Sequence, residues 1–242
     1  MKNRRLKAKI EFLKNGYGVL PDMIEDSELE LLSDIYLRCF SEKQTKGRKE
    51  LGGKDDQGRE ALPQILNPST IFPELRDLGV YDRCQEAAKY ILDDLEVDLG
   101  GEHMILKPAK YGIATPWHQD QAYHDPTLLY RNINFWFPLD GATEEEGCLH
   151  FVEGSHLGSV VFPHSYLIDG DVQSALVAND QEYWNLNGVA APCLKGSCTI
   201  HHSYCMHYAG PNMSQRDRKA FILSYRSKPK PKERPWVLPW TQ

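Results

Sequence analysis

The sequence predicts a mainly β protein with helices in its N-terminal part. Two patterns lead to this prediction: helical periodicity is confined to residues 1–95, and beyond residue 100 short apolar runs alternate with clusters of Gly, Pro, Asn and Asp. Several short strands with regular turn signals are typical of a sandwich or barrel. Of the 242 residues, 41% are hydrophobic and 26% are charged, which excludes a disordered tail, a collagen-like chain and a coiled coil.

The N-terminal part is expected to contain two helices with a break between them. Residues 1–40 have helical periodicity, interrupted at residues 15–20, where glycines favour a turn into a short strand. Asp26 and Ser27 can cap the second helix, and Glu30 follows Ser27 at the spacing of a capping box.

The rest of the chain continues as a loop, a helix and the strands of the β part. Residues 41–60 are polar and predict a loop or lid, and helical periodicity returns over 73–95. Apolar runs predict strands at 103–107, 133–139, 148–152, 196–201 and 220–225. We expect one domain over 1–242, with a helical and lid part at 1–99, the β core at 100–226 and a basic, proline-rich tail at 227–242.

Charge and cysteine usage limit the class of protein further. The net charge of −6 is opposite to that of proteins that clamp nucleic acid through phosphates. No apolar stretch approaches the roughly 18 residues of a membrane helix, and the charged stretch after the basic start is unlike a secretory signal. The six cysteines contain no C-x-x-C pair, so we expect free thiols in a reducing, cytoplasmic setting.

A short motif at Trp117-His-Gln-Asp-Gln carries the main chemical signal. On an extended strand residues i and i+2 point to the same face, so His118 and Asp120 would project side by side. A third ligand from a distant strand would complete a set of two histidines and one carboxylate, which is typical of non-haem Fe(II) oxygenases. His207 is the candidate; His201 and His202 are alternatives, of which at most one can face the site.

An arginine near the end of the β core could bind an acidic co-substrate. Arg218 opens the apolar run at 220–225, and a planar guanidinium can hold a carboxylate through two hydrogen bonds. Arg216 is the nearby alternative.

Three stretches together resemble the phytanoyl-CoA dioxygenase (PhyH) family of Fe(II)- and 2-oxoglutarate-dependent oxygenases. They are Trp117-His-Gln-Asp, Glu146-Gly-Cys-Leu-His-Phe-Val-Glu-Gly-Ser-His, and His207-Tyr-Ala-Gly-Pro-Asn-Met-Ser through Arg218-Lys-Ala. The resemblance covers residues 103–226, about half of the chain, and the N-terminal half matches only loosely. It implies a double-stranded β-helix core, the jelly-roll of cupin-like proteins.

The resemblance also implies roles for individual residues. His118, Asp120 and His207 would ligate Fe(II), and Arg218, which fits the family register better than Arg216, would pair with the distal carboxylate of 2-oxoglutarate. Further contacts to the co-substrate are expected from a second group of residues, namely Trp136, His103 and Ala209, with Gln64 or Asn67 as candidates for an upstream polar contact. O2 is the other co-substrate.

The implied reaction is oxidation, chiefly hydroxylation, of an unactivated carbon, with release of succinate and CO2. Relatives that halogenate carry a small residue where this chain has Asp120, so chlorination is not expected. A non-catalytic metal-binding jelly-roll protein and a zinc hydrolase on the same ligands are the alternatives, and Arg218 argues against the first of these.

The substrate is expected to be a neutral or amine-bearing small molecule, such as a natural-product intermediate. Between residues 111 and 206 the only basic residues are Arg131 and Lys195, against eleven Asp and Glu, which predicts an acidic pocket mouth unfavourable for the phosphates of coenzyme A. The polar loop at 41–60 and the stretch at 164–192 are expected to contact the substrate. No nucleic-acid or membrane partner is expected, and the oligomeric state stays open.

Overall fold

A computed structural model describes residues 2–41, 47–52, 54, 56–172 and 174–241. Its α-helices are α1 (Lys2–Asn15), α2 (Asp26–Ser41), α3 (Val80–Leu92) and α4 (Gln181–Asn187). Short 3-10 helices are η1 (Pro68–Thr70), η2 (Pro73–Asp77), η3 (Asp120–Tyr123) and η4 (Pro239–Thr241). The strands are β1 (Tyr17–Leu20), β2 (Arg48–Glu50), β3 (Pro63–Leu66), β4 (Val97–Lys107), β5 (Thr115–His118), β6 (Leu128–Leu129), β7 (Asn132–Pro138), β8 (Leu149–Val152), β9 (His164–Tyr166), β10 (Leu176–Ala178), β11 (Gly188–Ala191), β12 (Cys198–His202), β13 (His207–Ala209), β14 (Arg218–Ser227) and β15 (Lys230–Pro231).

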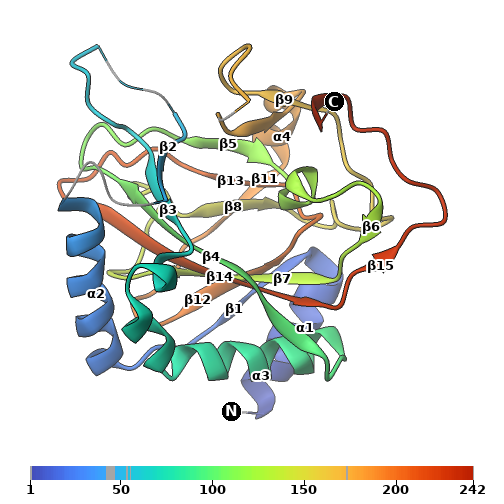
Figure 1. Ribbon diagram of the computed structural model, residues 1–242, viewed down its shortest axis with the longest axis horizontal. Coiled ribbons are helices and arrows are strands. Elements are labelled where there is room, and N and C mark those ends of the chain that lie inside the picture. Colours follow the sequence, from blue (N-terminus) through green and yellow to red (C-terminus); the bar gives the residue numbers. More distant parts are fainter. Residues whose placement is uncertain (1, 42–46, 53, 55, 173, 242) are drawn as a thin grey trace.

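Two antiparallel sheets face each other and form the jelly-roll that the sequence predicted (Figure 1). The larger sheet has seven strands in the order β1-β12-β7-β14-β4-β3-β2, and the smaller has four in the order β11-β8-β13-β5. Neighbouring strands are far apart in the chain, as in a double-stranded β-helix. This topology places β5 beside β13 and therefore brings two distant histidines together.

The three N-terminal helices cover the outer face of the larger sheet (Figure 1). Strand β7 shows why: Ile133, Phe135 and Phe137 point into the core beneath the helices, while Asn134 and Trp136 point to the opposite face and line a pocket. This alternation agrees with the period of two predicted from the sequence. Burial of the apolar face fixes the register and thereby which side chains reach the pocket.

The helices and main strands lie close to their predicted positions, but two local predictions were wrong. Helix α2 begins at Asp26. Its N-terminus is capped by Glu28, whose carboxylate accepts from the backbone N–H of Glu25 at 2.9 Å. The predicted capping box of Ser27 and Glu30 therefore does not form. Part of the polar stretch at 41–60 is strand β2, which pairs with β3 at the sheet edge. The rest of that stretch lies partly outside the described residues.

The C-terminal tail packs back on the body through Trp240 and Trp236. The indole N–H of Trp240 donates to the carbonyl of Ala122 at 3.0 Å, and the ammonium of Lys232 lies 3.0 Å from the ring centroid of Trp236. Within the described ranges, no helix combines the length and the apolar character needed to cross a membrane.

Candidate metal centre and co-substrate pocket

The two sheets enclose a pocket of about 480 Å³ that contains the predicted triad. His118 ends β5 and His207 begins β13, and the two residues are directly opposite in the antiparallel ladder. Asp120 opens η3, and the intervening Gln119 is extended, with φ −118° and ψ 130°, which keeps Asp120 on the side of His118. The strand is thus shorter than predicted, but the i, i+2 relationship holds.

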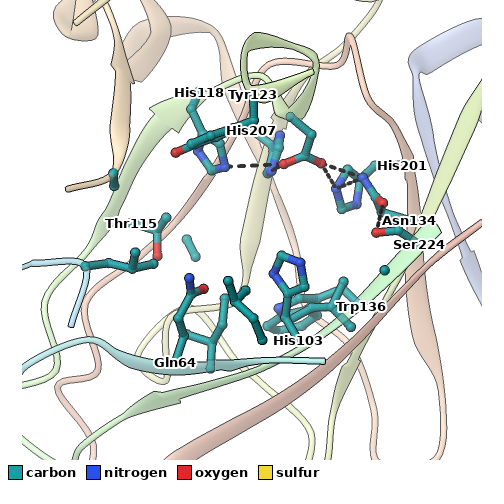
Figure 2. A pocket seen from close by; sticks show the side chains of 18 of the residues that line it. Gln64, His103, Thr115, His118, Tyr123, Asn134, Trp136, His201, His207 and Ser224 are labelled. Atoms are coloured by element: carbon teal, nitrogen blue, oxygen red, sulfur yellow. Dashed lines mark hydrogen bonds and ion pairs between the residues drawn. The ribbon is translucent and has the colours of Figure 1, made fainter. Parts of the chain in front are cut away.

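The three side chains converge on one point (Figure 2). Nε2 of His118 and Nε2 of His207 each lie 3.6 Å from Oδ1 of Asp120, and one ligand atom from each residue lies within 4.8 Å of the others. Among the described residues this is the group of histidine, cysteine and acidic side chains able to hold a metal ion.

Hydrogen bonds on the far side of each imidazole fix its tautomer. Nδ1 of His118 lies 2.8 Å from the carbonyl of Pro116, and Nδ1 of His207 lies 2.9 Å from the carbonyl of Cys205. A carbonyl can only accept, so each Nδ1 carries the hydrogen, and each Nε2 presents a lone pair to the centre. This is the protonation state that a metal-binding histidine needs.

Electrostatics keep His207 and Asp120 unprotonated at neutral pH. Burial lowers the pKa of His207 well below its usual value. Burial by itself would raise the pKa of Asp120, but the imidazoles of His207, His118 and His201 together lower it well below its usual value. One carboxylate and two imidazoles match the donor set that binds Fe(II) with open coordination positions.

A second set of side chains holds the other oxygen of Asp120 (Figure 2). Nε2 of His201 lies 3.1 Å from Oδ2, and the side-chain amide of Asn134 donates to the same oxygen. The hydroxyl of Ser224 donates in turn to Oδ1 of Asn134. His202 points away from the pocket, toward the rings of Phe12 and His156, as strand alternation requires.

Arg218 is a buried cation at the other end of the pocket. Its side chain is 3% exposed, and its guanidinium carbon lies 5.3 Å from the ring of Trp136. Burial lowers the pKa of Arg218 to about 10, which leaves it charged at neutral pH. Nε and Nη1 have no hydrogen-bond partner among the described residues. Because an unpaired buried charge is costly, this guanidinium is built to receive an anion.

Arg216 is placed differently, which separates the two candidates for the clamp. Its guanidinium forms an ion pair with Glu146, and its side chain is about half exposed rather than part of the pocket lining. Glu146 is itself buried and accepts from the backbone N–H of Thr143 at 3.0 Å. The motif after His207 is held by Asn212, whose amide donates to the carbonyls of Lys107 and Arg216.

The remaining co-substrate candidates lie in the same pocket with one exception. The lining includes Trp136, His103, Ala209 and Gln64, and Figure 2 shows Gln64, His103 and Trp136 at its floor, opposite the triad. Asn67 is not part of this lining. It is the residue that precedes η1, where its backbone is left-handed with a φ of 50°. Gln64 is therefore the upstream polar residue that the pocket contains.

The predicted acidic mouth is not found. Among the described residues that line the pocket, Asp120 is the acidic one, and the other charged side chains are Lys49, Arg218 and Arg226. The remaining acidic residues between 111 and 206 lie outside this lining, in turns and loops and, in the case of Glu182, in helix α4. From the stretch at 164–192, Val172, Ser174 and Ala175 reach the pocket.

Comparison with known proteins identifies the family of this chain. The family model for phytanoyl-CoA dioxygenase (PhyH) matches residues 12–220. The chain is 28% identical to the phytanoyl-CoA dioxygenase domain-containing protein 1 homolog of Dictyostelium discoideum, over 72% of this chain and 64% of that protein.

Solved structures with a similar fold include proteins crystallised with 2-oxoglutarate. The crystal structure of EvdO2 from Micromonospora carbonacea var. aurantiaca, complexed with 2-oxoglutarate, is 36% identical, has a TM-score of 0.85 and covers 96% of this chain and 95% of that chain. The epimerase SnoN, solved with Fe3+, alpha ketoglutarate and nogalamycin RO, is 19% identical with a TM-score of 0.74, over 94% and 85% of the two chains, and shares the fold.

The fold and the pocket define a non-haem iron, 2-oxoglutarate-dependent oxygenase. The family match spans most of the sequence, and the chain belongs to the phytanoyl-CoA dioxygenase (PhyH) family. Iron is accordingly its metal cofactor and 2-oxoglutarate its co-substrate.

Proposed function

We propose that this chain hydroxylates, or otherwise oxidises, an unactivated carbon of a small molecule, with conversion of 2-oxoglutarate to succinate and CO2. In this proposal His118, Asp120 and His207 ligate Fe(II), and Arg218 pairs with the distal carboxylate of 2-oxoglutarate. One observation carries it: a convergent group of two histidines and one carboxylate shares one pocket with a buried guanidinium that has no anionic partner in the described part of the chain.

The protein residues prepare the site for this chemistry. Iron held here would supply the activation of O2 that is coupled to decarboxylation of 2-oxoglutarate. Three protein ligands leave about three coordination positions open, while Asn134 and His201 keep the second oxygen of Asp120 engaged. Apolar walls from Ile105, Leu149 and Ile222 exclude water around Arg218, which strengthens its attraction for a carboxylate.

Asp120 also bears on the type of oxidation. Its carboxylate occupies the position from which a halide would have to bind the metal, so hydroxylation or desaturation is favoured over chlorination. The network around Oδ2 supports this assignment, because His201 and Asn134 orient the carboxylate toward the two histidines.

Two alternatives predict different behaviour. A metal-binding protein without catalysis needs no cation for a second anion. Arg218, however, is buried in the pocket, and its Nε and Nη1 have no hydrogen-bond partner among the described residues. A zinc hydrolase needs a general base beside the metal; Asp120, the one acidic residue in the described lining, is already used as a ligand.

The test measures succinate formed from 2-oxoglutarate by the Fe(II)-loaded protein in air, with a Zn(II)-loaded sample and an anaerobic sample as controls. We expect slow succinate formation even without substrate, dependent on both Fe(II) and O2. Iron binding without any succinate formation would support the non-catalytic metal-binding protein instead. Hydrolytic activity of the Zn(II) form without O2 would support the zinc hydrolase.

The charged residues of the pocket lining bear on the class of substrate. A neutral or amine-bearing small molecule stays a prediction, but its premise was an acidic pocket mouth, and the lining contains Lys49 and Arg226 in addition to Arg218. The charges present in the pocket favour a different substrate class.

A further inference from the structure

The pocket face of the larger sheet is organised in successive cross-strand pairs. Three of the pairs between β7 and β14 line the pocket: Trp136 with Ile222, Asn134 with Ser224, and Asn132 with Arg226. The first pair lies beside Arg218, and the second contacts Asp120. The third pair, which we name the Arg226 pair, is therefore two residues, or about 7 Å, further along the sheet, on the side of the metal away from Arg218.

The Arg226 pair offers both a positive charge and an unused acceptor. The guanidinium of Arg226 lies 5.6 Å from the ring of Tyr130. Asp98 is its register neighbour on β4, but within the described residues no ion pair joins Arg226 to a carboxylate. Asn132 is 3% exposed and lines the pocket, and its Oδ1 has no hydrogen-bond partner in the described chain. A buried acceptor without a donor is costly unless a ligand supplies one.

Two glycines of β4 lie next to this pair in the pocket lining. Gly101 is the register neighbour of Ser224, and Gly100 lies at the bulge between Gly101 and Leu99, where a Cβ would meet the Arg226 side chain at 3.1 Å. A Cβ built on Gly101 would meet only Nε2 of His103, at 4.0 Å, so open space rather than packed protein lies above this residue. The open space therefore lies beside Ser224, one cross-strand pair away from Arg226, whose side chain packs over Gly100.

We propose that the Arg226 pair is a substrate subsite that binds an anionic group, a carboxylate or a phosphate. The guanidinium of Arg226 neutralises the anion, and Oδ1 of Asn132 accepts from a neighbouring N–H or O–H of the same molecule. The carbon to be oxidised then lies between this anchor and the metal, within the length of about one cross-strand pair. This inference rests on the proposed function, because it takes the iron site and the Arg218 site as occupied by Fe(II) and 2-oxoglutarate.

The test uses the full chain, anaerobic and saturated with Fe(II) and 2-oxoglutarate, titrated in a calorimeter with benzoate, phenyl phosphate, benzamide and benzylamine. We expect at least one of the two anions to bind about tenfold or more tightly than benzamide. Arg226→Gln should abolish this preference. Arg234→Gln, which removes the same charge from an exposed position of the tail, should retain it.

A second variant and a second readout keep the result decisive. Gly101→Leu should block both anions by filling the space, while the visible charge-transfer band of the Fe(II)–2-oxoglutarate chelate is unchanged. Benzoate and phenyl phosphate, compared with each other, distinguish a carboxylate from a phosphate site.

Three outcomes overturn the inference: equal binding of anion and amide, a preference for benzylamine, or an anion preference that survives in Arg226→Gln. An anion that bleaches the chelate band acts at Arg218 and counts against it as well. If the band never forms in the unmodified protein, the proposed function fails instead, and the calorimetric comparison still decides whether the Arg226 pair binds anions.

Discussion

Oδ2 of Asp120 lies 3.1 Å from Nε2 of His201, while Oδ1 of the same carboxylate lies 3.6 Å from Nε2 of His118 and of His207. The two oxygens therefore face different partners. His201 belongs to the larger sheet and the two other histidines to the smaller one, so Asp120 joins the sheets at the centre of the pocket. One oxygen is left for the metal, and the other is held by protein.

The first prediction follows from this division of the carboxylate. Asn134→Ala removes one donor to Oδ2 and should weaken Fe(II) binding about 10- to 100-fold, as is common for residues that orient metal ligands. Affinity is measured by competition with a chromophoric chelator. Asn187→Ala, on the exposed end of α4, is the matched control. Unchanged affinity in Asn134→Ala would show that Asp120 does not need this support.

The second prediction separates the two arginines. Arg218→Ala should raise the KM for 2-oxoglutarate about ten- to a hundredfold, because a hydrogen-bonded pair with a charged group contributes roughly 1.5–3 kcal/mol. Arg216→Ala should have a much smaller effect, since its guanidinium pairs with Glu146 outside the pocket. Both values come from succinate formation at varied 2-oxoglutarate. The reverse order of effects would place the clamp at Arg216.

The third prediction concerns halide. In chloride buffer, the native protein incubated with a panel of small metabolites should give oxygenated or desaturated products and no chlorinated ones, because the Asp120 carboxylate occupies the halide position. Mass spectrometry detects chlorine by its isotope pattern. A chlorinated product would contradict the assignment of Asp120 as a ligand.

The fourth prediction concerns acid stability of the metal-free protein. Burial, with further contributions from His156 and His201, lowers the pKa of His202 to about 4, below its value of roughly 6.5 in an unfolded chain. The unfolded state then binds more protons over this window, so the free energy of unfolding falls as the pH decreases from about 6.5 to about 4. The contribution of His202 alone is up to about 3 kcal/mol.

Urea unfolding at about pH 7 and about pH 5 measures this loss. His202→Asn keeps a side-chain acceptor for the N–H of Tyr204, which now donates to Nδ1 of His202 at 3.1 Å, but cannot be protonated. This variant should lose less stability on acidification than the native chain. An equal loss in both would exclude His202 as the cause.

Much of the site could be predicted because its residues come with local sequence signals. His118 and Asp120 are two positions apart, so strand geometry places their side chains on one face. The alternation along β7 likewise separates Trp136, which lines the pocket, from Phe135 in the core. The resemblance to the PhyH family supplied the rest, because it favoured Arg218 over Arg216 and assigned Trp136 to the co-substrate.

The supporting contacts could not be predicted in the same way. His201, Asn134 and Ser224 meet only because β12, β7 and β14 are neighbours in the folded sheet, and no local pattern encodes that order. The charge of the pocket was misjudged for the same reason. A count of acidic residues along 111–206 ignores which of them face inward, and Arg226 lies outside that span.

The most direct test of the account is an anaerobic titration of the metal-free protein with Fe(II) and 2-oxoglutarate, followed by the visible charge-transfer band of the chelate. We predict that the native chain develops this band with one Fe(II) per chain, that His207→Ala does not develop it, and that His202→Asn, altered on the opposite face of β12 from the site, behaves like the native chain. A His207→Ala protein that stays folded and still forms the band at native Fe(II) affinity would contradict the triad, and His201 would then be the residue to examine as the third ligand.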